Sequence, residues 1–265
     1  MSGLSLTALY RYPVKSLGGE NHQELDVRAR GFGFDRHWMV VDAQGRFVTQ
    51  RQQPRMTLIS VRVDDKGALH LSVPGMPDMD VGPYSDERVE VSVWGDSVSA
   101  APADSAADAW LSEFLALPCR LVCFPQEQVR AVDPEFAQPS DQVAFADGFP
   151  FLLISQASLD DLNDRLERPV SMRRFRPNLV VDGCEAYAED TWRRIRIGDL
   201  EFRVAKPCSR CIIPTIDPKT GLRGKEPLQT LMGYRRRDNK VYFGQNLIHD
   251  RSGQLVVGMP VEVLE

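Results

Sequence analysis

Cys208 and Cys211 stand three positions apart in the stretch KPCSRCIIPTIDPKTG, which covers residues 206–221 of a chain with only five cysteines. A Lys-Pro pair precedes them, an arginine stands between them, and a turn-forming segment rich in proline and glycine follows. Positive charge and turn backbone around a thiol favour its thiolate form. Because a thiolate is a soft ligand for a soft or high-valent metal, the stretch predicts metal chemistry at a cysteine.

Three other interpretations of the pair remain open. A C-x-x-C motif is half of a four-ligand zinc site, and Cys119 and Cys123 could supply the other half, although Cys119 begins an apolar run typical of a buried strand. A thioredoxin-like redox pair requires the motif at a helix N-terminus, whereas Pro214 and Pro218 interrupt any regular helix after it. The pair could also be two buried cysteines without a chemical role.

A second group of polar residues lies near the N-terminus. The segment YPVKS places Lys15 and Ser16 after a proline-stiffened turn, and GFDRHWMVVD places Arg36 at the start of a β run. A single Lys or Arg at the end of a strand is usually solvated surface, because such side chains are rarely buried unless they are paired. These residues therefore indicate a site only in combination with others.

A third group lies in the segment RRFRPNLVV, where Arg173, Arg174 and Arg176 precede a hydrophobic strand and Asn178 stands beside it. Guanidinium groups bind phosphate through paired hydrogen bonds, so the cluster predicts a local anion pocket. The alternative is that these arginines form a solvated surface whose positive charge is balanced by the aspartates of segment 154–167. Together, the three groups indicate a ligand that is anionic, bears a phosphate and is completed by one cysteine sulfur.

The composition excludes several classes of protein. Among 265 residues, 32 Lys and Arg stand against 37 Asp and Glu, so a formal charge of −5 provides no general attraction for nucleic acid or an anionic membrane. The first residues lack the pattern of a secretory signal, and no window approaches the roughly 18 apolar residues of a membrane span. An odd, sparse set of cysteines is unlike a disulfide framework. We therefore expect a cytoplasmic protein.

The first part of the chain has the pattern of short strands. Runs such as HWMVVD, TLISVRV, ALHLSV and RVEVSVW alternate with turn signals between residues 4 and 97, which predicts a small barrel or sandwich. Residues 103–118 predict a helix capped by Asp104 or Ser105. We expect a small N-terminal β-barrel-like domain over residues 1–98 and a second domain over residues 99–265, with the boundary in the zone 98–125.

The second part of the chain is predicted to be mainly β with a few helices. Residues 124–148 form a polar stretch that we expect to be a long loop over the surface or over a site. Residues 154–167 predict a helix capped by Ser155 or Ser158. The runs NLVVDG, RIRIG, LEFRVA, GQNLIHD and QLVVGMPVEVLE predict strands. The overall expectation is therefore a mainly β chain of the α+β class.

The motifs occur together in the order of a known family. YPVKS, GFDRHWMVVD with VTQRQQPRM, FRPNLVV, and PCSRCIIPTIDPKTG with KEPLQTLMGYR resemble the MOSC family of molybdenum cofactor proteins. The resemblance is to the branch with an N-terminal MOSC-type β-barrel domain, which contains the mitochondrial amidoxime-reducing component and its bacterial relatives. It covers nearly the whole chain and implies a MOSC β-barrel domain with a few helices in the second part.

The resemblance also implies roles for individual residues. The family's metal ligand is the second cysteine of the CSRC motif, which is Cys211 here, and Cys208 would be its neighbour. Gly148, in DGFPF, would contribute backbone where some relatives have a hydroxyl side chain. Asp217, in TIDP, is expected to assist catalysis with Cys211 by supporting the cysteine loop, or simply to end a turn. Other motif positions correspond to residues that hold the molybdopterin: Lys15, Ser16, Arg36, Arg176, Asn178, Ser209 and Arg210.

The function that the resemblance implies is that of an oxidoreductase. It would reduce N-hydroxylated compounds, such as amidoximes, hydroxylamines and N-hydroxylated bases, at a molybdenum cofactor. The chain has no flavin or nicotinamide fingerprint, and its remaining cysteines lack the C-x4-C-x2-C spacing of a plant-type ferredoxin domain. Electrons are therefore expected from a separate carrier, which would be a ferredoxin, a flavodoxin or a flavin reductase. The alternative is a molybdenum cofactor carrier or sulfur-relay protein in which Cys211 holds the cofactor or a persulfide without turnover.

Overall fold

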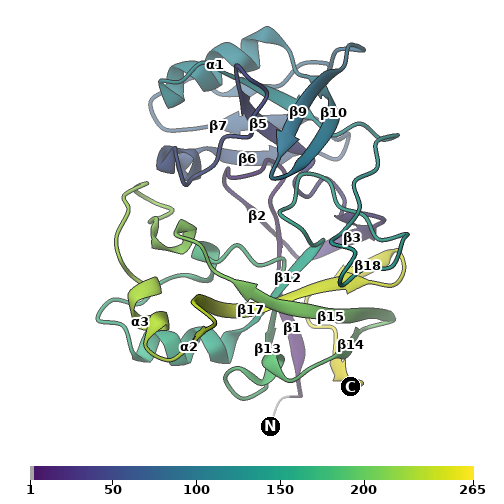
Figure 1. Cartoon of the computed structure of the whole chain (residues 1–265), viewed down its shortest axis with the longest axis vertical. Coiled ribbons are helices and arrows are strands. Elements are labelled where there is room, and N and C mark those ends of the chain that lie inside the picture. Colours follow the sequence, from purple (N-terminus) through teal and green to yellow (C-terminus); the bar gives the residue numbers. More distant parts are fainter. Residues whose placement is uncertain (1–2) are drawn as a thin grey trace.

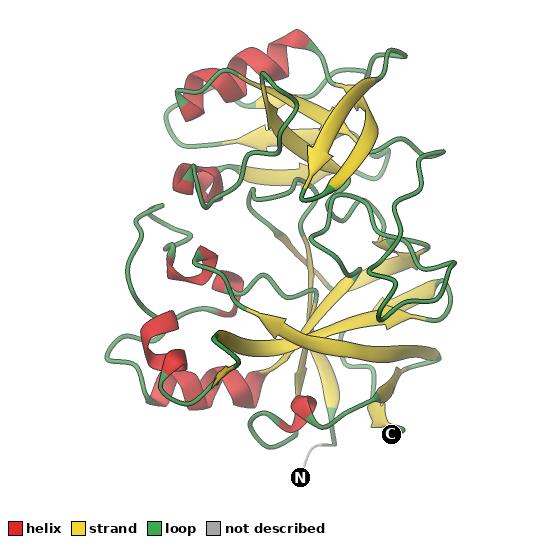
Figure 2. Cartoon of the chain, in the orientation of Figure 1, coloured by secondary structure: helices red, strands yellow, loops and turns green. Residues whose placement is uncertain are grey.

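The computed structural model describes residues 3–265, in which strands far outnumber helices (Figure 2). The expected mainly β architecture with a few helices is confirmed. None of the helices within residues 3–265 has both the length and the apolar character needed to span a bilayer. The helices are α1 (Ser105–Leu115), α2 (Gln156–Asp164) and α3 (Leu228–Met232), and the short 3-10 turns are η1 (Pro54–Leu58), η2 (Met172–Arg174), η3 (Ala188–Asp190) and η4 (Ile213–Thr215).

The strands are short in the first half of the chain and include two of ten residues in the second half. They are β1 (Ser5–Arg11), β2 (Glu20–His22), β3 (Glu24–Arg28), β4 (Gly31–Phe32), β5 (Trp38–Asp42), β6 (Ser60–Val63), β7 (Leu69–Ser72), β8 (Met79–Asp80), β9 (Val89–Val93), β10 (Asp96–Pro102), β11 (Cys119–Cys123), β12 (Phe151–Ser155), β13 (Leu179–Asp182), β14 (Arg194–Ile197), β15 (Leu200–Ser209), β16 (Arg236–Arg237), β17 (Lys240–His249), β18 (Gly253–Val256) and β19 (Val261–Val263).

Figure 1 shows two lobes stacked along the long axis of the molecule. The lobe at the top contains α1 and two small sheets, with strand orders β5-β11-β10-β9 and β6-β7-β8. Trp38, Leu71 and Leu121 come from three different strands and belong to one buried apolar core. Burial of these large side chains is the main force that holds the lobe together.

Helix α1 covers this core, and the local sequence sets both of its ends. The side chain of Asp104 accepts a hydrogen bond from the Ala107 amide at 2.7 Å and so caps the first turn. Trp110 and Phe114 recur at helical spacing on the buried face. The helix ends at Leu115 and is followed by Ala116, whose φ of 50° is left-handed. The predicted helix and its Asp104 cap are confirmed.

A nine-stranded sheet forms the second lobe. Its strands follow the order β19-β14-β15-β17-β12-β13-β1-β2, and β16 pairs with β17. Strands β12 and β13 are parallel, and α2 lies between them in the chain. Ser155 caps α2, as predicted, through a hydrogen bond from the Ser158 amide to its Oγ at 3.1 Å. Phe151 and Phe202 lie in the apolar core on one face of the sheet.

The first strands of the chain are part of the second lobe. Strand β1 pairs with β13 and β2 within the nine-stranded sheet, and β3 pairs with β18 near the C-terminus. The division into residues 1–98 and 99–265 remains a prediction. In terms of strand pairing, the segment from β1 to β4 belongs with the C-terminal strands, and the chain passes through the first lobe between β5 and β11.

Strand β17 approaches β12 closely at Gly244. The φ of Gly244 is +80°, and a Cβ atom there would lie 2.6 Å from Cγ1 of Ile154 and 2.8 Å from the carbonyl oxygen of Leu153. Both neighbours belong to the buried strand β12. A larger residue at this position would therefore push apart the two strands that lead to the region between the lobes.

Gly244→Ala is expected to lower the free energy of unfolding by about 2 to 4 kcal/mol, because the methyl group meets strand backbone and the φ disfavours alanine. Urea denaturation measures this change. Gly224→Ala is the matched control, because its Cβ would meet only the carbonyl oxygen of Thr215, at 3.8 Å. Equal stability of the two variants would contradict the close approach of β17 and β12.

Candidate active site

A cavity of about 1190 Å³ lies where the two lobes meet. Its lining comes from the first lobe (Thr49 and Trp94 among others), from the long loop between β11 and β12, and from the end of β15. All nine residues that the sequence predicts to hold a cofactor line this cavity, and their roles remain a prediction. They are Lys15, Ser16, Arg36, Gly148, Arg176, Asn178, Ser209, Arg210 and Cys211.

The lining of the cavity is strongly positive. Three aspartates, Asp96, Asp133 and Asp147, are its only acidic residues, so the formal charge of the lining is +5 in a chain whose net charge is −5. A concentration of one sign of charge in a concave site attracts ligands of the opposite sign. The basic residues are Lys15, Arg36, Arg51, Arg130, Arg176, Lys206, Arg210 and Lys240.

A buried amide and a buried carboxylate hold Arg36 in place. Asn178 is 1% exposed, and its Oδ1 accepts a hydrogen bond from Nη1 of Arg36 at 3.0 Å. Its Nδ2 donates to Oδ1 of Asp35 at 3.2 Å and to the carbonyl oxygen of Tyr10 at 3.1 Å. The Asp35 carboxylate also pairs with Arg36 and accepts a hydrogen bond from the Tyr12 amide at 2.8 Å. Every polar atom of the Asn178 side chain is therefore used within the protein.

The ring of Tyr12 lies between two guanidinium groups. Cζ of Arg36 is 4.5 Å and Cζ of Arg176 is 4.2 Å from the centre of the ring. Burial raises the pKa of Tyr12 to about 12 and lowers the pKa of Arg176 to about 10, so the phenol stays neutral and the guanidinium stays charged at neutral pH. The ring thus stabilises two like charges that would otherwise face each other.

Three residues of the cavity have a left-handed backbone. The φ angles are 69° at Ser16, 46° at Arg36 and 57° at Arg176, although none of them is glycine. Such conformations cost free energy and persist where the surrounding structure enforces them, often at binding sites. The two arginines that flank Tyr12 are therefore held by strained backbone as well as by side-chain contacts.

Two buried guanidinium nitrogens have no hydrogen-bond partner within residues 3–265. They are Nη2 of Arg176 and Nε of Arg210. Other nitrogens of these groups do have partners, since Nη1 of Arg176 donates to the carbonyl oxygen of Leu17 at 2.6 Å and Nη2 of Arg210 donates to that of Phe175 at 2.7 Å. A buried donor on a charged group is costly to leave unpaired. Both side chains line the cavity, so an anionic ligand bound there would lie next to these donors.

Lys15 is held by the long loop. Its ammonium donates to the carbonyl oxygen of Phe145 at 2.8 Å and pairs with Asp147. Burial lowers the pKa of Lys15, and the Asp147 carboxylate opposes this shift. Desolvation acts to raise the pKa of Asp147, but the charges of Lys15 and Arg51 outweigh it, so that this pKa lies well below its usual range. Nε1 of Trp94 also donates to Asp147 at 3.1 Å.

Cys208 and Cys211 are both half-buried in the cavity lining, but they have different surroundings. Sγ of Cys208 accepts a hydrogen bond from Nη1 of Arg210 at 3.1 Å. Cys211 follows the end of β15, and within residues 3–265 its thiol has no hydrogen-bond partner. The thiol of Cys211 is therefore the one that is available to a ligand in the cavity.

The geometry does not support a zinc site shared by the four cysteines. Cys119 and Cys123 are buried in the apolar core of the first lobe. The described part of the chain contains no group of three or more His, Cys, Asp or Glu side chains that could hold a metal ion. After Cys211 the chain forms the 3-10 turn η4 instead of a regular helix, as the prolines predict.

Asp217 does not line the cavity, and its expected role in catalysis, through support of the cysteine loop, remains a prediction. Its Oδ1 accepts a hydrogen bond from the Lys219 amide at 2.8 Å, and its Oδ2 pairs with Nη2 of Arg174 at 2.8 Å. Arg174 also donates to the carbonyl oxygen of Pro214 at 3.2 Å. Asp217 thus fixes the loop that follows Cys211 instead of contacting a ligand.

The predicted arginine cluster is divided by the fold. Arg176 lines the cavity, whereas Arg173 is exposed and donates to the carbonyl oxygen of Gly19 at 2.7 Å, and Arg174 pairs with Asp217. The η2 turn and the left-handed backbone of Arg176 direct these side chains to different places. The prediction of an anion pocket from three adjacent arginines was therefore wrong for two of them.

Several residues around the cavity were not predicted from the sequence to belong to the site. Asp147 directly precedes Gly148 in the motif DGFPF, and Tyr12 begins the motif YPVKS, so both were close to recognised positions. Arg51 lies within the quoted motif VTQRQQPRM, whereas Trp94 and Arg130 lie outside the quoted motifs, and only the three-dimensional fold brings them to the cavity.

Fold and site together define a two-lobed, mainly β protein with an anion-attracting cavity between its lobes. Residues 3–118 match the sequence profile "MOSC N-terminal beta barrel domain", and residues 140–262 match "MOSC domain". These two matches agree with the fold class expected from the sequence.

Several curated proteins similar to the chain are named as amidoxime-reducing components. "Mitochondrial amidoxime-reducing component 1" of Homo sapiens is 38% identical over 281 residues, which cover 98% of this chain and 83% of that protein. The Mus musculus protein of the same name is 38% identical over 284 residues, covering 98% and 82%. "Mitochondrial amidoxime reducing component 2" of Homo sapiens is 35% identical over 277 residues, covering 97% and 82%. The chain belongs to the MOSC family, in the branch that contains the mitochondrial amidoxime-reducing components.

Asp147→Asn is expected to lower the free energy of unfolding at pH 7 by about 1 kcal/mol or less, because Lys15 loses its partner while solvent screens a carboxylate side chain that is 60% exposed. The folded-state pKa of Asp147 is lowered, so the ionised carboxylate stabilises the fold above the unfolded pKa of about 4, and this contribution decreases as the pH falls below that value toward the lowered folded-state pKa. The free energies of unfolding of the variant and the parent should therefore converge as the pH is lowered, and urea denaturation between pH 7 and pH 3 measures this change.

The control for this prediction is Asp65→Asn. Asp65 is exposed and forms no ion pair within residues 3–265. A difference between Asp147→Asn and the parent that stays constant over the whole pH range would contradict the pairing of Asp147 with Lys15.

Proposed function

We propose that the chain is a molybdenum-cofactor-dependent oxidoreductase that reduces N-hydroxylated compounds, such as amidoximes, hydroxylamines and N-hydroxylated bases. The observation that carries the proposal is the convergence, in one positive cavity, of a free Cys211 thiol with two unpaired buried guanidinium nitrogens. The printed names of the relatives, amidoxime-reducing components, support the substrate class.

The donor set of the cavity fits a cofactor that combines a phosphate with a sulfur-coordinated metal. Arg176 and Arg210 would each offer a free buried N–H group to anionic oxygen atoms, and Cys211 would offer its thiolate to the metal. Ser16 and Ser209 have hydroxyl groups suited to the polar edges of a pterin. When bound, the cofactor supplies metal-centred redox and oxygen-accepting chemistry that no side chain of the protein has.

The remaining site residues act mainly by positioning. Asn178 uses all of its polar atoms inside the protein, so its proposed contribution is to hold Arg36 toward the cavity. Cys211 lies two residues after the end of β15, and the amide of Arg210 between them donates to the carbonyl oxygen of Val241 in β17 at 2.7 Å. The backbone next to Cys211 is therefore tied to β17, which would help to hold the thiol in place.

Electrons are proposed to come from a separate carrier, such as a ferredoxin, a flavodoxin or a flavin reductase, because the sequence has no flavin or nicotinamide fingerprint. We also propose a cytoplasmic location. All five cysteines are free, which suits a reducing compartment.

The test of the proposal is reduction of benzamidoxime by protein purified from a host that makes the molybdenum cofactor, with reduced methyl viologen as the electron source. The expected result is benzamidine in many-fold excess over protein. Transfer of the cofactor to an apo-enzyme without any benzamidine would instead support the carrier function, and a protein that contains zinc and no pterin would overturn both.

Cys211→Ala is expected to lower the molybdenum content per chain by more than about tenfold, since the metal loses its protein ligand. Cys208→Ala is expected to stay within about threefold of the parent, because Sγ of Cys208 contacts Arg210 and would not bind the metal. Metal analysis of the purified variants measures both. The same loss in the two variants would refute the assignment of Cys211 as ligand.

Arg176→Ala is expected to weaken retention of the pterin by about tenfold, which corresponds to one lost charge-assisted hydrogen bond. Fluorescence of the released and oxidised pterin per chain measures retention during dialysis. Arg173→Ala is the matched control, because Arg173 is a nearby exposed arginine outside the cavity lining. Equal pterin content in both variants would remove Arg176 from the site.

A further inference from the structure

The charge of the chain is unevenly distributed along the sequence. Residues 206–240 contain nine Lys and Arg against three Asp and Glu, a formal charge of +6, whereas the rest of the chain carries 23 against 34, a formal charge of −11. The positive segment is also the one that contains Cys211. In an acidic protein, such a concentration of positive charge within 35 residues indicates that the charge has a local role.

Six cations of this segment are exposed and form no ion pair within residues 3–265. We call them the basic face: Lys219, Arg223, Lys225, Arg236, Arg237 and Lys240. Some exposed arginines elsewhere, such as Arg46, Arg88 and Arg165, pair with carboxylates of the chain itself, whereas Arg120 and Arg193 do not. The charge of the basic face is therefore not neutralised by the chain and is free to attract an acidic partner.

The basic face borders the cavity on two sides. On one side, the loop between η4 and α3 reaches the first lobe, where Nη2 of Arg223 donates to the carbonyl oxygen of Arg51 at 2.7 Å. In Figure 1 this light-green loop rises toward the upper lobe. Arg51 lines the cavity, and on the other side Lys240, at the start of β17, lines it directly. A protein bound to the basic face would thus lie beside the cavity that contains Cys211.

Apolar side chains are exposed within the same segment. Ile212 is 41%, Leu222 is 71% and Met232 is 50% exposed, and they are three of the six large hydrophobic residues exposed within residues 3–265. Ile212 directly follows Cys211. Apolar contacts surrounded by charges are typical of the small interfaces of transient complexes.

We propose that the basic face and its three apolar residues form the docking surface for a small acidic electron-carrier protein. The inference rests on the proposed function, because a reductase without its own electron source needs a carrier beside its redox site. Opposite charges accelerate such encounters and orient the partners without requiring a large interface.

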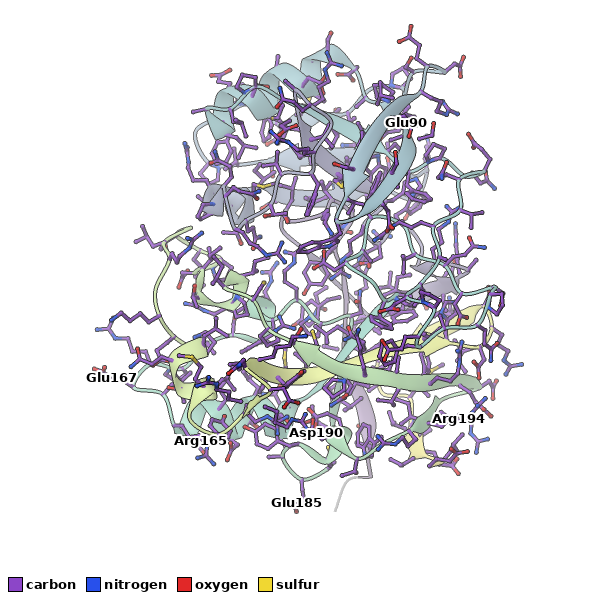
Figure 3. All side chains as sticks on the ribbon, in the orientation of Figure 1. Glu90, Arg165, Glu167, Glu185, Asp190 and Arg194 are labelled. Atoms are coloured by element: carbon purple, nitrogen blue, oxygen red, sulfur yellow. The ribbon has the colours of Figure 1, made fainter. Side chains whose placement is uncertain are left out.

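The experiment compares two triple charge reversals in the holoprotein. Lys219→Glu/Lys225→Glu/Arg236→Glu changes the basic face, and the control Lys66→Glu/Arg120→Glu/Arg193→Glu applies the same change of charge elsewhere. All six residues are exposed, none lines the cavity, and none forms an ion pair within residues 3–265. Arg193 precedes Arg194, which Figure 3 labels near the lower end of the molecule.

The probes are a plant-type ferredoxin and a flavodoxin, and the Kd of each is measured by calorimetry, together with benzamidoxime reduction. Reversal of the basic face is expected to raise the Kd and the KM for the carrier by at least about tenfold at low salt, and the control by less than about threefold. The difference should shrink in about 0.5 M salt. Turnover with reduced methyl viologen should be unchanged in both variants.

The outcomes separate this proposal from the proposed function. Equal effects of the two reversals on carrier binding, or no effect of either, would overturn the docking surface even if viologen supports turnover. Selective loss of carrier binding without any benzamidoxime reduction would support the surface and overturn the reductase. Tighter binding of a DNA duplex than of either carrier would assign the basic face to nucleic acid and overturn the proposal.

Discussion

The hydrogen-bonded group of Asp35, Arg36 and Asn178 is the interaction on which the rest of the structure depends. Asn178 precedes β13 in the sheet of the second lobe, whereas Asp35 and Arg36 precede β5, the strand that leads into the first lobe. The Arg36 amide donates to the carbonyl oxygen of Tyr12, and the Phe145 amide donates to that of Arg36. Four segments of the chain therefore meet at one half-buried arginine, which links the two lobes and forms one wall of the cavity.

The arrangement of the cavity favours a bound ligand and lowers the stability of the ligand-free protein. Buried cations lie close together, two of their nitrogens are unpaired, and Ser16, Arg36 and Arg176 have strained backbone. The π face of Tyr12 offsets part of the repulsion, and Asp147 offsets part of it at Lys15. An anionic ligand would offset the remainder, so ligand binding and stability are coupled in this protein.

Local signals in the sequence were sufficient to predict most helices and strands and much of the site. The caps Asp104 and Ser155 and the alternating apolar runs depend on neighbouring residues, so they could be read from the chain directly. Motif order brought nine dispersed residues into one predicted site, and the fold places all nine in one cavity. The pairing of β1 with β13 and the different directions of Arg173 and Arg174 depend on long-range packing and backbone conformation, which local patterns do not encode.

Our proposal places a molybdenum cofactor between the lobes, held by Cys211 and by the arginines of the cavity. A crystal structure of protein from a cofactor-producing host, with anomalous scattering recorded on both sides of the molybdenum absorption edge, tests it most directly. We expect an anomalous peak bonded to Sγ of Cys211 and a ligand phosphate within hydrogen-bonding distance of Arg176 or Arg210. A molybdenum peak at another position, or a zinc ion bound by both Cys208 and Cys211, would contradict it.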